Sequence, residues 1–159
     1  MSKILKTGVV NTSGYPGNNL AINSKRNIQP TSSYNIANFN TSKEITAGKV
    51  YTATIKGTIG ENKQFGLWMG GGYTGLGYCS VIEEGLFKLT FTSPATIAGN
   101  GSRTAINVYA VPSNNSNQSS LEWFKLEEGS GSTLWTPNEN DNDYITKSSF
   151  FEIDDNCKF

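Results

Sequence analysis

Histidine is missing from all 159 residues of this sequence. A chain without histidine lacks the side chain that most often serves as general base and as metal ligand near neutral pH. The G-x-S-x-G motif that carries the nucleophile of α/β-hydrolases is also missing. Adjacent carboxylates such as Glu83 and Glu84 would point to opposite sides of a strand, so they do not form the converging pair of a glycosidase. We therefore predict that the chain is not an enzyme.

Charge is scarce and evenly divided. The 13 basic and 13 acidic residues together make up 16% of the chain. Without a basic excess, the phosphate neutralisation that drives nucleic-acid binding has no source. No apolar run approaches the roughly 20 residues of a membrane-spanning helix. The opening Met1–Lys6 is not followed by the apolar core of a signal peptide. We expect no nucleic-acid partner, no membrane insertion, and synthesis in a cytoplasm without export by a signal peptide.

Cysteine is almost absent, and its two copies, Cys79 and Cys157, stand far apart. Their spacing allows a disulfide but does not require one. The acidic runs Asp141–Asp143 and Asp154–Asp155 offer oxygen ligands that calcium accepts, yet neither has the Gly and Glu positions of an EF-hand loop. We expect these runs to be solvated, and we predict no metal site and no cofactor.

The residues that are abundant favour strands and turns. Gly, Ser, Thr and Asn are common, and Tyr and Phe outnumber Met. Leu86–Thr92 shows the clearest alternation, with Phe87, Leu89 and Phe91 on one face. Eight strand-like segments are separated by turn residues: Leu20–Asn23, Tyr34–Phe39, Val50–Ile59, Gln64–Met69, Gly77–Ile82, Leu86–Thr92, Thr104–Val111 and Leu121–Glu128. This pattern predicts an all-β fold, a β-sandwich and specifically a jelly roll of about eight antiparallel strands.

The last of these segments leads into the most distinctive motif of the chain. In Leu121–Glu128, Phe124 and Leu126 lie on one face, while Trp123 and Lys125 lie on the other. Gly129 closes the segment, and a Gly/Ser-rich turn leads to Trp-Thr-Pro at positions 135–137. Because proline cannot donate to a sheet ladder, no strand is expected to continue beyond it.

Two motifs of this sequence resemble a known family. The run Lys-Leu-Glu-Glu-Gly at 125–129, followed by Trp-Thr-Pro at 135–137, resembles the closing K-L-E-x-G and W-T-P of carbohydrate-binding-module-like jelly rolls in tailed-bacteriophage virion proteins. The run from Asn19 to Ser24 is similar to the N-L-L-x-N-S that often opens these domains. The resemblance covers about residues 19–138. It implies a structural component of a fibre, tail, baseplate or head decoration.

The same resemblance implies a location on the virion, other virion proteins as partners, and adhesion to host-surface glycans as an added function. An alternative is a sugar-binding accessory module of a polysaccharide-degrading enzyme. A linker to a catalytic domain or a secretion signal would favour that alternative, and the sequence contains neither signal.

Composition divides the chain into an N-terminal arm (1–19), the predicted jelly roll (20–137) and a C-terminal tail (138–159). The two ends carry apolar residues that are too few to build a core of their own. Such exposed clusters usually mark contacts with another chain, although packing back on the chain's own sandwich is the alternative. We predict a homo-oligomer, with a trimer as first choice, assembled through Ile4, Leu5, Val9, Val10, Phe150 and Phe151.

A glycine-rich stretch, Phe65–Tyr78, contains the candidate ligand-binding residues. Its Gly70–Gly75 formally matches G-x-G-x-x-G, but a strand-like segment follows instead of the helix that dinucleotide binding requires. Aromatic rings flanked by glycines offer an open surface to the apolar face of a sugar. Trp68, Tyr73 and Tyr78 are therefore the candidate glycan-binding residues, and the alternative is that Trp68 belongs to the core.

Overall fold

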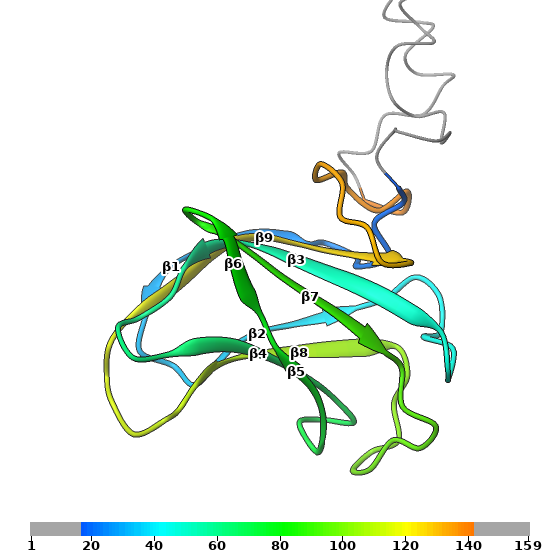
Figure 1. The fold of residues 1–159 in the computed structure, drawn as a ribbon, viewed down its shortest axis with the longest axis horizontal. Helices are drawn as coiled ribbons and strands as arrows, with labels where there is room; N and C mark the ends of the chain where they lie inside the picture. Colours follow the sequence, from blue (N-terminus) through cyan, green and yellow to red (C-terminus); the bar gives the residue numbers. More distant parts are fainter. Residues whose placement is uncertain (1–16, 142–159) are drawn as a thin grey trace, which may run out of the picture.

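A computed structural model of the protein describes residues 17–141, which form two antiparallel sheets packed face to face and contain no helix (Figure 1). The five-stranded sheet has the order β1 (Lys25–Thr31), β9 (Ser119–Glu128), β3 (Val50–Thr58), β7 (Leu86–Thr92) and β6 (Ser80–Glu83). The four-stranded sheet has the order β2 (Asn35–Asn40), β8 (Ala105–Val111), β4 (Gln64–Met69) and β5 (Thr74–Tyr78). The prediction of an all-β sandwich is confirmed.

The strand pairs are nested within one another. β4 pairs with β5, β3 with β7, β2 with β8, and β1 with β9, so that the first half of the chain pairs with the second half in reverse order. Successive strands along each half alternate between the two sheets, except that β6 and β7 are neighbours in the five-stranded sheet. The result is a jelly-roll-like sandwich in which β6 extends one edge of the five-stranded sheet.

The core lies between the sheets and follows the period-two alternation of the strands. Phe124 on β9 stacks on Phe39 of β2 with ring centroids 4.6 Å apart. Phe87 on β7 meets Phe65 of β4 edge-on at 5.0 Å. All four rings are buried, and each pair joins one sheet to the other. The predicted inward face of the last strand, with Phe124 and Leu126, is therefore confirmed.

The predicted strand at Leu20–Asn23 is wrong. These residues form only an isolated bridge between Ala21 and Thr41, followed by a turn in which Asn23 has a φ of 51°. The first strand is β1, which lies at a sheet edge, where a proline such as Pro30 is tolerated. Its pairing with β9 has two register irregularities, so its sequence lacks a clean alternation.

The predicted single strand Gly77–Ile82 is also wrong, because the structure divides this segment between two sheets. β5 ends at Tyr78 in the four-stranded sheet, and β6 begins at Ser80 in the five-stranded sheet. Cys79 lies at the crossing, where it is buried and its N–H donates to the Phe65 carbonyl at 2.8 Å. Burial raises the pKa of the Cys79 thiol to about 12. Cys157 lies outside the described residues, so the pairing of the two cysteines stays open.

The two motifs that carry the family resemblance meet in space at one end of the five-stranded sheet (Figure 1). Asn19 is 1% exposed and connects them. Its amide nitrogen lies 2.9–3.1 Å from the Ser24 hydroxyl and the carbonyls of Phe124 and Thr136. Its amide oxygen accepts from the backbone N–H groups of Ala21 and Leu126, both at 3.0 Å. One buried side chain thus ties the entry of the domain to its last strand and its exit.

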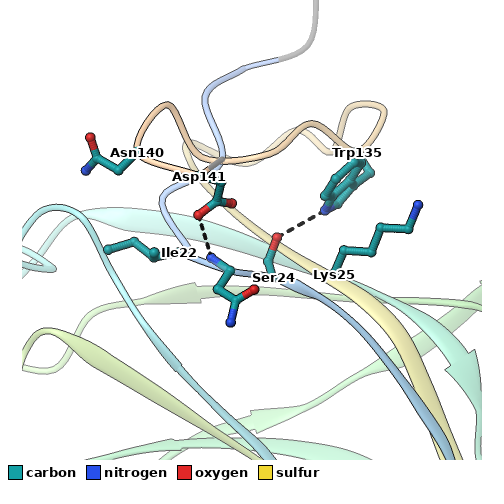
Figure 2. A pocket seen from close by; sticks show the side chains of 7 residues that line it. Ile22, Ser24, Lys25, Trp135, Asn140 and Asp141 are labelled. Carbon is teal, nitrogen blue, oxygen red and sulfur yellow. Dashed lines mark hydrogen bonds between the residues drawn. The ribbon is translucent and has the colours of Figure 1, made fainter. Parts of the chain in front are cut away.

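Residues just outside the predicted 20–137 domain take part in the same network. The Asn138 amide donates to the Asn19 carbonyl at 2.7 Å and to the Ser42 hydroxyl at 2.8 Å. The Asp141 carboxylate accepts from the Asn23 backbone N–H at 2.8 Å, a contact that Figure 2 shows. We call the bonded set Gly17, Asn19, Asn23, Ser24, Ser42, Lys125, Glu127, Thr133, Trp135, Thr136, Asn138 and Asp141 the clasp.

Lys125 and Glu127 lie two residues apart on the outer face of β9. Both bind the segment that follows this strand, residues 129–137, which we call the exit segment. The Lys125 ammonium donates to the Thr133 hydroxyl at 2.8 Å and to the Leu134 carbonyl. Glu127 accepts from the Thr133 N–H at 2.9 Å and from its hydroxyl at 2.8 Å. Because the exit segment covers them, Lys125 is fully buried, and burial lowers its pKa to about 8 against the opposing effect of the Glu127 charge.

Trp135 packs against the last strand. Its ring centroid lies 6.3 Å from that of Trp123 on the last strand, and its indole N–H donates to the Ser24 hydroxyl at 3.1 Å. Figure 2 shows it at the side of an open cavity of about 460 Å³, opposite Asp141. The ring is half-buried.

Candidate functional site

The outer face of the four-stranded sheet carries a group of four aromatic rings that are partly or largely exposed. In β8, the buried residues Ile106, Val108 and Ala110 point into the core, so Asn107 and Tyr109 point outward. Trp68 lies opposite Asn107 on β4, and Tyr78 on β5 lies opposite Gly66. Tyr34 precedes β2 at the other side of the sheet. The strand order therefore brings rings from four separate segments onto one surface.

These rings form a continuous series, which we call the aromatic row. The centroids of Tyr34 and Tyr109 are 4.9 Å apart. Tyr109 meets Trp68 at 5.2 Å and Trp68 meets Tyr78 at 6.0 Å, with interplanar angles of 83° and 82°. Both tyrosines thus stand nearly perpendicular to the indole, one on each side of it. Tyr34 and Tyr78, at the two ends of the row, are 40% and 48% exposed.

Two glycines make room for the indole at the centre of the row. A Cβ at Gly66 would come within 2.5 Å of the Trp68 ring, and a Cβ at Gly75 would lie 3.2 Å from its Nε1. Any larger residue at Gly66 would displace the ring from the sheet. The glycine-rich sequence therefore has a physical role here, since it lets Trp68 lie along the surface of β4 and β5.

A group of asparagine side chains adjoins the aromatic row. The Asn107 amide nitrogen donates to Asn38 Oδ1 at 2.8 Å, and Asn35 and Asn38 bond reciprocally at 3.1 Å. Asn35 also donates to the Val108 carbonyl. The Asn107 amide oxygen is buried and has no hydrogen-bond partner among the described residues. An unpaired buried acceptor costs about 1–3 kcal/mol, so this oxygen lowers the stability of the domain.

The two sheets differ sharply in charge. The four strands of the smaller sheet contain no Asp, Glu, Lys or Arg. The five strands of the larger sheet contain all the charged strand residues of the described chain: Lys25, Arg26, Lys56, Glu83, Lys88, Glu122, Lys125, Glu127 and Glu128. The aromatic row therefore stands on a surface without formal charge.

The structure brings together two of the three predicted glycan-binding residues. Trp68 and Tyr78 are neighbours in the aromatic row. Tyr73 is 76% exposed in the β4–β5 turn, where its side chain adjoins Gly99 of a neighbouring loop. Sequence reasoning missed Tyr34 and Tyr109. The alternation of Thr104–Val111 placed Tyr109 on an outward face, but only the pairing of β8 with β4 shows that Trp68 lies beside it.

The predicted assembly residues lie outside the described part of the chain. Ile4, Leu5, Val9, Val10, Phe150 and Phe151 belong to segments 1–16 and 142–159. Their role stays a prediction.

Two hollows lie beside the exit segment. One is the cavity of Figure 2. The other is a groove of about 410 Å³ on the outer face of the five-stranded sheet, between Trp123, Leu134 and Trp135. Within residues 17–141, no group of three or more His, Cys, Asp or Glu side chains is placed to hold a metal ion. No helix in this part of the chain is long and apolar enough to cross a membrane.

Comparison with known proteins gives no relative on which to base a function. No protein-family model, no curated protein and no solved structure matches the chain. The features that bear on function are therefore the aromatic row, the clasp and the motif resemblance.

Proposed function

We propose that this chain is a structural and adhesive protein of a tailed-bacteriophage virion and that its aromatic row binds glycans of the host surface. The observation that carries the adhesive part is the series of four contiguous rings on a sheet without charged residues. Soluble domains usually cover such rings or use them for binding. An aromatic row that remains partly exposed is a ready binding surface.

Sugar chemistry suits this surface. A pyranose ring has one face of C–H groups, which packs on an aromatic ring, and a rim of hydroxyls, which needs hydrogen-bond partners. Trp68 and its flanking tyrosines supply the first element, while the phenol hydroxyls and the asparagine amides supply the second. The pairing of β4 with β8 on one side and with β5 on the other fixes the rings before a ligand arrives, which lowers the entropic cost of binding.

A double variant, Trp68→Ala with Tyr78→Ala, is expected to abolish binding on a glycan array to which the wild-type protein binds. The reason is that the central ring and one flanking ring of the row are both lost. Lone sites of this type are weak, so the protein should be displayed as an assembled oligomer or on beads to raise the effective concentration.

The matched control is Trp123→Ala, which removes a half-exposed tryptophan from the opposite sheet. Retained binding in this variant together with loss in the double variant supports the aromatic row. Binding that survives the double variant but disappears with Trp123→Ala would place the site in the groove of the five-stranded sheet instead. An array without hits for the displayed wild-type protein would contradict the adhesive function.

The virion part of the proposal has its support in the two terminal motifs. In the clasp, both motifs have the same structural role, which is to close the sandwich. Asn19 from the first motif and Lys125, Glu127 and Trp135 from the second form hydrogen bonds that connect the entry of the domain, its last strand and its exit. The motifs resemble those of virion proteins, whose partners are other virion proteins. An accessory module of a polysaccharide-degrading enzyme would bind similar ligands, so cryo-electron microscopy of purified particles distinguishes the two functions.

Assembly through the chain ends yields a separate expected result. Phe150→Ser with Phe151→Ser should reduce the oligomer, a trimer in our proposal, to monomers, because it removes large apolar groups from the proposed contact. Light scattering coupled to size-exclusion chromatography measures the mass of the full chain. The exposed loop variant Tyr73→Ser serves as control and should keep the wild-type mass. A monomeric wild-type protein, or an unchanged mass in the double variant, would contradict assembly through this end.

A further inference from the structure

We propose that the groove between Trp123, Leu134 and Trp135 binds residues 150–155 of a neighbouring copy of the chain. This inference rests on the proposed assembly through the C-terminal end. It adds the surface that receives this end and the chemistry by which that surface recognises it.

The groove is an apolar hollow on the outer face of the five-stranded sheet. Its volume of about 410 Å³ falls in the range of roughly 300–1,000 Å³ that is typical of ligand pockets, so it has room for large side chains. Leu134 in its lining is 78% exposed, more than any other large apolar residue of the described chain. Leu86, Trp123 and Trp135 are only partly buried. Exposed apolar surface of this kind usually marks a contact with another chain.

The surroundings of the groove carry more positive than negative charge. Three lysines are strand partners of residues that line it: Lys25, Lys56 and Lys88. The Lys25 ammonium also lies 5.8 Å from the centre of the Trp135 ring. Glu83 is a strand partner of Leu86, whereas Glu122 lines a separate hollow beside β1. The groove therefore suits a segment that combines large apolar groups with acidic ones.

Of the two ends that lie outside the described residues, the C-terminal one has this composition. Residues 1–16 contain Lys3 and Lys6 but no acidic residue. In the C-terminal end, Phe150 and Phe151 are followed directly by Glu-Ile-Asp-Asp. Two aromatic rings can anchor in the apolar groove while the carboxylates that follow them face the lysines. We therefore assign residues 150–155 to the groove.

The position of Asp141 indicates that the groove receives this segment from another copy. Asp141 lines the cavity of Figure 2 on the side opposite Trp135. Trp135 lines both this cavity and the groove, so it stands between the groove and the start of the C-terminal tail. The chain from Asp141 to Phe150 spans at most about 30 Å when extended. It would have to turn back around Trp135 to reach its own groove, whereas a path away from the clasp leads to a neighbour.

Such an exchange also fits the proposed oligomer. Each copy offers one groove and one tail, which are different surfaces. A contact between different surfaces is heterologous, and heterologous contacts build a closed ring when the rotation between copies allows it. A trimer is one such ring.

Two variants of the full chain test the contact from its two sides. Leu134→Asp puts a negative charge into the groove, and Phe150→Ser with Phe151→Ser removes the two rings. Each should reduce the oligomer to monomers in light scattering coupled to size-exclusion chromatography. Val81→Asp is the matched control, because Val81 is 65% exposed on β6 of the same sheet, and it should keep the wild-type mass. Urea denaturation verifies that the groove variant and its control are folded.

A mixture of the two monomeric variants distinguishes exchange between copies from packing within one copy. Leu134→Asp retains an intact tail, and the double serine variant retains an intact groove. Mixed in equal amounts at about 100 µM, they should form a dimer through one tail and one groove, which sedimentation velocity detects. Neither variant alone should form this dimer at the same concentration.

A synthetic peptide of residues 146–156 is the direct probe of the groove. Titration calorimetry should show that it binds the double serine variant, and adding Leu134→Asp to that variant should weaken binding by at least about tenfold. The same peptide with serine at positions 150 and 151 should not bind. Raising sodium chloride from about 50 mM to about 500 mM should weaken binding of the natural peptide by at least about twofold, because salt screens the lysines.

The results separate the inference from the proposal on which it rests. A wild-type oligomer that the double serine variant disrupts but Leu134→Asp does not would overturn the groove as the receiving surface and leave the assembly in place. A peptide that binds while the mixture stays monomeric would overturn the exchange, since the groove would then hold the tail of its own copy. Binding that is insensitive to salt would overturn the role of the lysines. A monomeric wild-type protein would overturn the proposed assembly itself. Protein displayed on beads does not need to oligomerise, so the glycan array tests the adhesive function independently.

Discussion

Replacing Asn19 with leucine is expected to lower the free energy of unfolding by about 3–5 kcal/mol. Leucine has a similar volume but can neither donate nor accept. It would leave the carbonyls of Phe124 and Thr136 and the N–H groups of Ala21 and Leu126 without their present partner inside the protein. Each such group costs about 1–3 kcal/mol when it stays buried, and relaxation recovers part of the total. Urea denaturation followed by tryptophan fluorescence measures the change.

The neighbouring residue provides the control. Asn18 is exposed, so Asn18→Leu should change the free energy of unfolding by less than about 0.5 kcal/mol. If Asn19→Leu lost less than about 1 kcal/mol, the domain would not depend on the connection between its entry and its exit. The physical account of the two terminal motifs would then be wrong.

Lys125 should make the protein more stable at higher pH. Burial lowers its pKa to about 8 in the folded protein, while its ordinary value is 10.5. Between these values the unfolded chain holds a proton that the folded chain has released, so the unfolded state binds more protons and the free energy of unfolding rises with pH. We expect a gain of about 1–3 kcal/mol from pH 8 to pH 10 that is assigned to this residue, since bonds to Thr133 and Leu134 offset part of the burial.

The gain is measured as a difference, because tyrosines and other lysines also titrate in this range. Urea denaturation of the wild-type protein and of Lys125→Met at several pH values gives two curves, and the wild-type free energy of unfolding should rise with pH more steeply than that of the variant. Lys49→Met, which removes an exposed lysine whose partner is Glu128, serves as the control for the loss of one lysine. Parallel curves for the wild type and Lys125→Met would show that the buried ammonium keeps its ordinary pKa.

The sequence predicted the fold class because alternation survives in the strands that face the core. β7 and β9 carry regular apolar positions, and the structure buries Phe87, Phe91, Phe124 and Leu126 as expected. Alternation fails where the backbone departs from regular pairing. β1 has irregular register on β9 and contains Pro30, so its segment reads as a loop. The change of sheet at Cys79 could not be predicted, because β5 and β6 follow one another without a turn signal.

Only part of the candidate site could be predicted from the sequence. The glycines around Trp68 indicated a ring on an open surface, and the structure gives two of them, Gly66 and Gly75, that role. Tyr34 and Tyr109 are more than 20 residues from Trp68 in sequence and reach it only through the pairing of β2, β8 and β4. The unpaired oxygen of Asn107 is likewise a product of three-dimensional packing. Local periodicity specifies which face a residue takes, but the neighbours on that face depend on the order of strands.

The closeness of Gly17 and Asp141 has a mechanical consequence. Gly17 bonds to Thr133 and Thr136, while Asp141 bonds to Asn23, so both ends of the described chain leave from the clasp (Figure 1). Tension applied between the flanking segments would pass along this short path and load the clasp bonds first. The four-stranded sheet lies outside that path. A pull on the two ends would therefore leave the aromatic row undistorted until the clasp gives way, which would suit the adhesive role that we propose.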